Sequence, residues 1–127
     1  MTARVKLVLC TEDRFFGPGV CELLEWIRET GSIQAATARM ELSYTKAWKI
    51  LNRAEREMGT SLITRMSGGK NGGRSILTEE GERAVRNYRE MERKLSALAG
   101  ELVLEYWGAN LRRPPVGSEP PSDGMLL

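Results

Sequence analysis

The chain has 127 residues, of which 41% are hydrophobic and 28% are charged, values typical of one soluble globular domain rather than of two large ones. It contains no histidine, which excludes Ser-His-Asp and Cys-His nucleophilic sites and any histidine-ligated metal. The net charge is only +2, so a partner has to be inferred from where the charges lie along the chain.

The two cysteines, Cys10 and Cys21, do not form a CxxC pair, and no second pair is present to complete a thiolate metal site. We expect two free thiols in a reducing cytosol, with a disulfide between them as the alternative. The longest apolar run near the start, from Leu7 to Cys10, is too short for a signal peptide or a membrane span. The sequence therefore predicts a cytoplasmic protein without membrane contact, metal, cofactor or catalytic residues.

The first elements are a strand and a helix. Residues 3–10 alternate between polar and apolar side chains, which predicts a strand, and a loop follows as far as Gly17. Pro18 suits the first turn of a helix, where its missing N–H would have no partner. Apolar residues then recur at helical spacing, and Gly31 fits the position just after the helix end.

Two further helices follow in close succession. Ser32 is predicted to cap one helix, and Ser43 to cap another that ends at Gly59. A connection of about three residues joins them, which is typical of a helix-turn-helix. Trp26 and Trp48 lie on helices, and we expect them in the core or in an interface rather than on a base-stacking surface.

After the third helix the pattern changes from helix to strand. Residues 61–65 and 74–78 are short and rich in side chains that favour strands, and a segment rich in glycine separates them. Two strands around such a turn form a hairpin. A hairpin directly after a helix-turn-helix is a wing, which we place at residues 66–74.

Thr78 is predicted to cap a last helix over about residues 79–107, with three glutamates near the positive end of its dipole. Gly100 is a weak point, so the helix either ends there or continues to Trp107. Apolar residues repeat in alternating steps of four and three, which is typical of a coiled-coil seam. The first 78 residues cannot cover a helix of this length, so a second copy is predicted to pack on the seam. The predicted dimer interface consists of Ala84, Tyr88, Met91, Leu95, Leu98 and Leu102.

The predicted fold class is mainly α: a winged helix-turn-helix with a β-hairpin wing and a long C-terminal dimerisation helix. We expect this domain to span residues 1–107. Residues 108–127 are rich in proline, glycine and serine and contain few apolar side chains. They cannot bury enough surface to offset their ordering entropy, so we expect a disordered tail.

Positive charge is concentrated in the helix-turn-helix and wing. From Arg39 to Arg74 there are eight basic and three acidic residues, a net charge of +5 against +2 for the whole chain. Lys46, Lys49 and Arg53 share one helix face, and recognition helices present their first turn to base edges. A solvated face without a partner is the alternative. The predicted DNA-binding residues are Ser32, Gln34, Ser43, Tyr44, Thr45, Lys46, Lys49, Arg53, Arg65, Lys70 and Arg74.

Two motifs resemble a known family. The motif SYxxAW beginning at Ser43, together with SGGKxGG beginning at Ser67, resembles the N-terminal domain of ModE-type molybdate-responsive repressors. The wider spacing of residues between Leu42 and Arg65 is similar to that in the winged helix-turn-helix of LysR-type regulators. The resemblance covers about residues 5–100. It implies a dimeric DNA-binding regulator, with Ser43 to Lys49 in the recognition helix and Lys70 to Arg74 in the wing. ModE-type regulators carry a further, oxyanion-binding domain, which we do not expect within this sequence.

We therefore predict a homodimeric transcriptional regulator that binds double-stranded DNA. Its helix over residues 43–58 would enter the major groove, and its wing would lie on the flanking backbone or in the minor groove. The alternative is a protein-interaction module that pairs with another regulator or with a separate effector-binding protein. Salt-sensitive affinity for DNA distinguishes the two, because phosphate contacts release counterions. The sequence does not support an enzyme.

Overall fold

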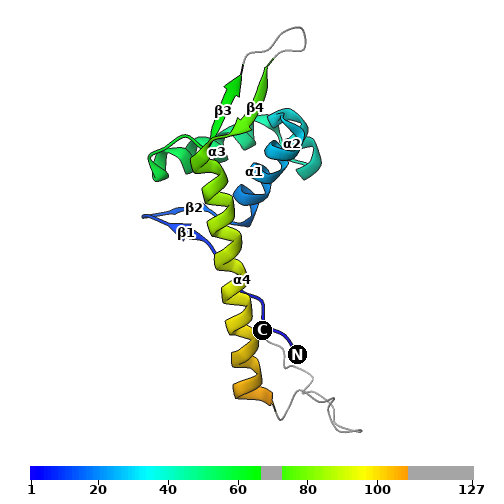
Figure 1. Ribbon diagram of the computed structural model, residues 1–127, viewed down its shortest axis with the longest axis vertical. Helices are drawn as coiled ribbons and strands as arrows, with labels where there is room; N and C mark the ends of the chain where they lie inside the picture. Colours follow the sequence, from blue (N-terminus) through cyan, green and yellow to red (C-terminus); the bar gives the residue numbers. More distant parts are fainter. Residues whose placement is uncertain (67–72, 109–127) are drawn as a thin grey trace, which may run out of the picture.

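The computed structural model describes residues 1–66 and 73–108. Within these ranges the chain forms four helices and two small antiparallel sheets, and three helices gather around the start of a fourth, much longer one (Figure 1). This arrangement confirms the mainly helical winged helix-turn-helix. The elements in chain order are β1 (Leu9–Cys10), β2 (Arg14–Phe16), α1 (Pro18–Thr30), α2 (Ile33–Met40), α3 (Tyr44–Met58), β3 (Ile63–Met66), β4 (Arg74–Leu77) and α4 (Glu79–Trp107).

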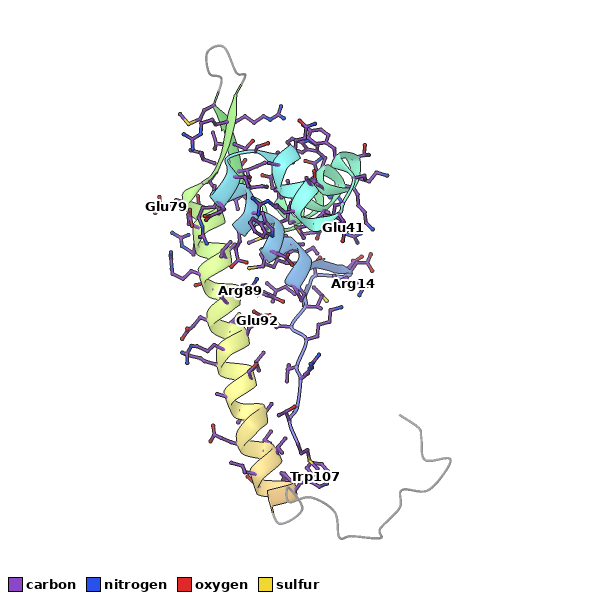
Figure 2. The ribbon with its side chains drawn as sticks, turned by 90° about the vertical axis from the view of Figure 1, so that its right-hand side faces the viewer. Arg14, Glu41, Glu79, Arg89, Glu92 and Trp107 are labelled. Carbon is purple, nitrogen blue, oxygen red and sulfur yellow. The ribbon has the colours of Figure 1, made fainter. Side chains whose placement is uncertain are left out.

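The start of the chain differs from the predicted strand over residues 3–10. Only β1 is paired, with Leu9 opposite Phe16 and Cys10 opposite Arg14, so β2 occupies a stretch that the sequence pattern assigns to a loop. The residues before β1 run beside α4 toward its far end (Figures 1 and 2). The apolar alternation there arises because Leu7 and Leu9 pack against the core, not because they belong to a longer sheet.

The predicted helix ends are confirmed. Pro18 lies in the first turn of α1, and Gly31 ends that helix in the left-handed conformation with a φ of 73°, its N–H donating to the Ile27 carbonyl at 2.7 Å. The Ser32 and Ser43 hydroxyls cap α2 and α3 by accepting hydrogen bonds from backbone N–H groups three residues later. These side-chain caps satisfy donors that a helix leaves without partners, so they set the limits of the helix-turn-helix.

One face of α1 forms the centre of the core. Leu23, Leu24 and Ile27 are fully buried on this face, against Leu51 of α3 and Leu62 just before β3. Burial of each such side chain is worth about 1.5–3 kcal/mol relative to exposure. The core therefore fixes α1 against the helix-turn-helix and the base of the wing.

Helix α4 begins directly against the base of the wing. The Thr78 hydroxyl donates to the Ser61 carbonyl at 2.6 Å, and the Thr78 N–H donates to the Leu62 carbonyl at 2.9 Å. Gly81 is buried here, and a Cβ on it would collide with the Leu62 carbonyl. A side chain at this position would push the helix away, so the close approach requires glycine.

Beyond this contact α4 continues without a break through Gly100, so the prediction of a helix reaching Trp107 is confirmed and a break at the glycine is wrong. Its 29 residues correspond to a length of about 44 Å at the usual rise. No helix in the described part of the chain is both long and apolar enough to cross a membrane.

Two ion pairs join α1 to the first half of α4. Arg89 donates to both carboxylate oxygens of Glu25, at 3.0 and 2.6 Å, and also to Glu92 at 2.7 Å. Arg28 pairs with Glu82 at 2.7 Å. Arg89 lies on the side of α4 that faces α1 (Figure 2), and its hydrogen bonds lower the pKa of Glu25 below its usual value. Bidentate pairs of this kind fix orientation as well as distance.

The predicted seam on α4 is divided between two environments. Tyr88 is 1% exposed, packs on Phe16 at a ring separation of 5.3 Å and donates to the Leu7 carbonyl at 2.8 Å. Its assignment to a dimer interface is therefore wrong, because the protomer itself buries it. Ala84 packs against the same core, and Leu95 is half-buried. The seam residues that stay exposed are Met91, Leu98 and Leu102.

The two glycines of α4 are predicted to respond oppositely to replacement by alanine. Gly81→Ala should lower the free energy of unfolding by about 1–3 kcal/mol, because the added Cβ meets the Leu62 backbone. Gly100→Ala should raise it by about 1 kcal/mol, since nothing lies within 4 Å and alanine favours helix. Urea unfolding followed by circular dichroism measures both. Equal stability of Gly81→Ala and the wild type would contradict the close contact.

Candidate nucleic-acid interface

The starts of α2 and α3 and the two strands of the wing meet at one end of the molecule, at the top of Figure 1. Between them lies a cleft of about 460 Å³, which we call the wing cleft. The first turns of helices favour anions, because their backbone N–H groups lack partners and carry the positive end of the helix dipole. The wing cleft is lined by Ser32, Ile33, Gln34, Tyr44, Arg65, Met66, Gly73, Arg74 and Ser75.

The wing is held against the helices by backbone hydrogen bonds at its base. In the sheet Ile63 lies opposite Leu77 and Met66 opposite Arg74. The Ser75 N–H donates to the Gly31 carbonyl at 2.9 Å, which joins β4 to the turn between α1 and α2. The described strands of the wing therefore have a fixed position relative to the helix-turn-helix.

A carboxylate on α3 strengthens this attachment. Glu55 accepts hydrogen bonds from the Leu62 N–H at 2.8 Å and the Ile63 N–H at 3.4 Å, which are the first backbone groups leading into β3. A charged acceptor makes such bonds stronger than neutral ones. Helix α3 and the wing are thus joined through one side chain.

Arg65 of β3 is held over the start of α3 by two aromatic residues. Its guanidinium donates to the Tyr44 hydroxyl at 3.0 Å and lies 5.2 Å from the centre of the Trp48 ring. The Tyr44 and Trp48 rings meet edge to face at 6.2 Å. Cation–π contact and hydrogen bonding together limit the conformations of the arginine, so its charge stays at the wing cleft.

Tyr44 keeps its own proton available while it accepts from Arg65. Hydrogen bonding with Trp48, followed by the nearby positive charge of Arg65, lowers the pKa of the Tyr44 hydroxyl from its usual value. The Tyr44 side chain is 43% exposed. The arrangement therefore offers a hydroxyl donor beside a guanidinium, a combination suited to a phosphate oxygen.

Arg74 lies on the opposite strand of the wing, beside the turn between α1 and α2. Its guanidinium Nε would be 3.4 Å from a Cβ placed on Gly31. Gly31 has a positive φ as well, so a side chain there would be strained and would also crowd the arginine. Two arginines, one from each strand of the wing, thus line the same cleft.

The N-terminal half of α3 presents its polar face outward. Ala47, Leu51 and Ala54 are fully buried on its inner face. The side chains on its outer face leave the core and carry two positive charges and two hydroxyls. These exposed residues are Ser43, Thr45, Lys46 and Lys49.

The structure gathers part of the predicted DNA-binding set and separates the rest. Arg53 pairs with Asp13 at 3.3 Å, and together with Lys46 it lines a different cleft on the side of β2. Lys70 lies outside the described residues. The predicted residues that line the wing cleft are Ser32, Gln34, Tyr44, Arg65 and Arg74.

Sequence reasoning missed the part that Trp48 plays in this interface. It is half-buried, in agreement with the prediction that it packs rather than stacks on a base, but its face also supports Arg65. Met66, 51% exposed at the edge of the cleft, was not predicted either. The spacing of Tyr44 and Trp48 by four residues places them on one helix face and is the signal that could have indicated the pair.

Comparison with known proteins gives a family and several relatives. The family of bacterial regulatory helix-turn-helix proteins of the lysR type matches residues 20–82. The molybdenum transport protein ModE of Herbaspirillum seropedicae is 34% identical over 74% of this chain and 33% of its own length. The DNA-binding transcriptional dual regulator ModE of Escherichia coli K12 is 33% identical over 69% of this chain and 34% of its own length. The chain therefore spans about a third of the length of these relatives.

Proposed function

Because residues 20–82 form a helix-turn-helix domain of the LysR family, and the chain is related in sequence to ModE regulators, we propose that this protein is a sequence-specific transcriptional regulator that binds double-stranded DNA. The observation that carries the proposal is the exposed, basic start of α3 beside a cleft lined by two arginines of the wing. Such a surface combines groups that read bases with groups that hold phosphate.

In the proposed complex α3 enters the major groove with its first turns against the base edges. Thr45, Lys46 and Lys49 are exposed on these turns, and lysine recognises guanine by donating to its O6 and N7 atoms. The wing then lies on the flanking backbone or in the minor groove. Arg65 and Arg74 bind phosphate at the wing cleft, and Ser32 and Gln34 contact the sugar-phosphate backbone.

We also propose that the protein acts as a homodimer formed through the far half of α4. This half extends beyond the other three helices (Figure 1). Large apolar side chains of α4 are exposed. Dimers place two recognition helices on neighbouring half-sites, which gives an operator with inverted symmetry. The exposed large apolar residues of α4 are Met91, near its middle, and Leu98, Leu102, Leu104, Tyr106 and Trp107 in its far half.

The same apolar surface favours a second candidate function. A protein-interaction module would use these side chains to pair with another regulator or with a separate effector-binding protein, and it would not require DNA. Exposed apolar patches on soluble proteins are typical of such contact sites. The two functions differ in their partner: the regulator needs the basic residues of α3 to bind DNA, whereas the interaction module binds a protein through α4 without them.

Selection from random duplexes is expected to return an inverted repeat whose half-sites are about 34 Å apart, one helical turn. Thr45→Ala combined with Lys46→Ala should relax specificity at one or two positions in each half-site, at about 1–3 kcal/mol for each base that the variant no longer recognises. Both side chains are exposed, so circular dichroism should show an intact fold. Arg86→Ala, which removes an exposed charge from α4, is the matched control and should leave specificity unchanged.

Enrichment of no sequence, with DNA binding that disappears near physiological salt, would contradict the regulator and favour the interaction module.

Removing the arginines of the wing cleft should weaken binding to all duplexes about equally. Arg65→Ala with Arg74→Ala is expected to reduce the slope of log affinity against log salt by about 0.9 for each phosphate that is no longer neutralised. Affinity measured by fluorescence anisotropy at several salt concentrations provides this slope. A weakening confined to one sequence, with an unchanged slope, would assign these arginines to base recognition instead.

Charges placed on the exposed seam should dissociate the dimer without unfolding the protomer. Leu98→Asp with Leu102→Asp is expected to weaken association by several kcal/mol, because the interface would bury unpaired carboxylates. Both positions are exposed in the protomer, and Ala97→Asp, which adds one such charge on another side of the helix, is the control for Leu98→Asp alone. Sedimentation velocity distinguishes the species, and a monomeric wild type at micromolar concentration would contradict the proposal.

A further inference from the structure

A second cleft lies on the other side of α3 from the wing cleft. It has a volume of about 510 Å³ and is formed by the N-terminal segment, β2, the start of α1, the turn between α2 and α3, and α3 itself. It shares no lining residue with the wing cleft. We call it the basic-rimmed cleft.

The floor of this cleft is apolar. Phe15, Val20, Met40 and Ile50 line it, and each is only half-buried while the rest of its surface packs on the core. These residues come from β2, α1, α2 and α3, so the floor is held by four elements that the core already fixes. It is a preformed apolar surface, which is the usual basis of a small-molecule site.

The rim of the cleft is positively charged. Lys6, Arg14, Lys46 and Arg53 line it, and no carboxylate does so among the described residues. Arg14 lies at the edge of the molecule away from α4 (Figure 2). Arg53 pairs with Asp13 at 3.3 Å, whereas the described residues provide no ion-pair partner for the other three cations. Four cations around an apolar floor complement an anion with an apolar body.

We propose that the basic-rimmed cleft binds a small amphipathic anion, with its apolar body on the floor and its carboxylate or comparable headgroup at the rim. The volume lies within the usual range for small-molecule sites, about 300–1,000 Å³. The lining comes from several short segments rather than from two long parallel helices, which would form the continuous groove that a docked helix needs. A small ligand therefore fits better than a peptide.

The spacing on α3 explains how one helix serves both clefts. Lys46, Ile50 and Arg53 are separated by four and three residues and share one face, while Tyr44 and Trp48 lie on the side of the wing. Lys49 is one residue from Ile50 but does not line the cleft. The proposal therefore stands on the cleft alone and does not depend on DNA binding.

Decanoate, used below its micelle concentration, is the probe. Its binding to the full chain is followed by two-dimensional amide NMR and by calorimetry. The amide shifts should be centred on residues 14–20 and 40–53. Decanol should bind more weakly than decanoate, and decyltrimethylammonium more weakly still, because the rim favours a negative headgroup.

Arg14→Gln with Lys46→Gln should weaken decanoate binding about tenfold or more, because the double variant removes two of the four positive charges at the rim. Lys49→Gln removes a charge from the same helix outside the cleft and should leave affinity unchanged. Both variants change exposed side chains, and their amide spectra report whether the fold is kept.

Three results would overturn the proposal. Shifts centred on the exposed end of α4 would place decanoate on the apolar seam instead. Equal affinity for decanoate, decanol and decyltrimethylammonium would show that the cations at the rim do not contribute to binding. Absence of decanoate binding, with an acidic amphipathic peptide shifting the same amides, would make the cleft a protein-docking surface.

Discussion

The close approach of Gly81 to the Leu62 carbonyl is the constraint on which the rest of the arrangement depends. It lets α4 start directly against the base of the wing, and the Thr78 cap and its hydrogen bonds to this region follow from that position. The same few residues adjoin Glu55, which links α3 to β3. Helix α3, the wing and α4 are therefore joined at one place, and a change there would alter the position of all three.

Charged side chains serve two separate purposes in this protein. Arg28 and Arg89 are paired with carboxylates and fix α1 against α4, so their charge is largely neutralised locally. Arg65 and Arg74 instead point their charge at the wing cleft, where Tyr44 and Trp48 restrain the first of them without neutralising it. Aromatic support is thus a way to fix a cation and still keep it able to bind an anion.

Local features of the fold were predictable from sequence, and contacts between distant residues were not. The caps at Ser32, Ser43 and Thr78 and the end at Gly31 follow from short-range chemistry, so the helix limits were predicted correctly. The heptad pattern located the apolar side of α4 but could not distinguish a protomer core from a partner, which is why Tyr88 was misassigned. The Arg65–Trp48 contact joins residues on different elements and has no local signal. Residues 3–8 alternate like a strand, yet a strand also needs a neighbour to pair with.

Because α4 is one unbroken helix, its length fixes the distance between the wing and the exposed seam. In a dimer formed through the far half of α4, the number of residues between the wing and the seam would set the positions of the two copies of α3. This is because α4 is anchored at Gly81 and continuous to Trp107. One inserted residue would move the seam by about 1.5 Å and turn it by about 100°. Seven would keep nearly the same face and lengthen the arm by about 10 Å, roughly three base pairs of B-DNA. The length of α4 would then determine the length of the preferred operator, although α4 itself lies outside the proposed DNA-binding surface.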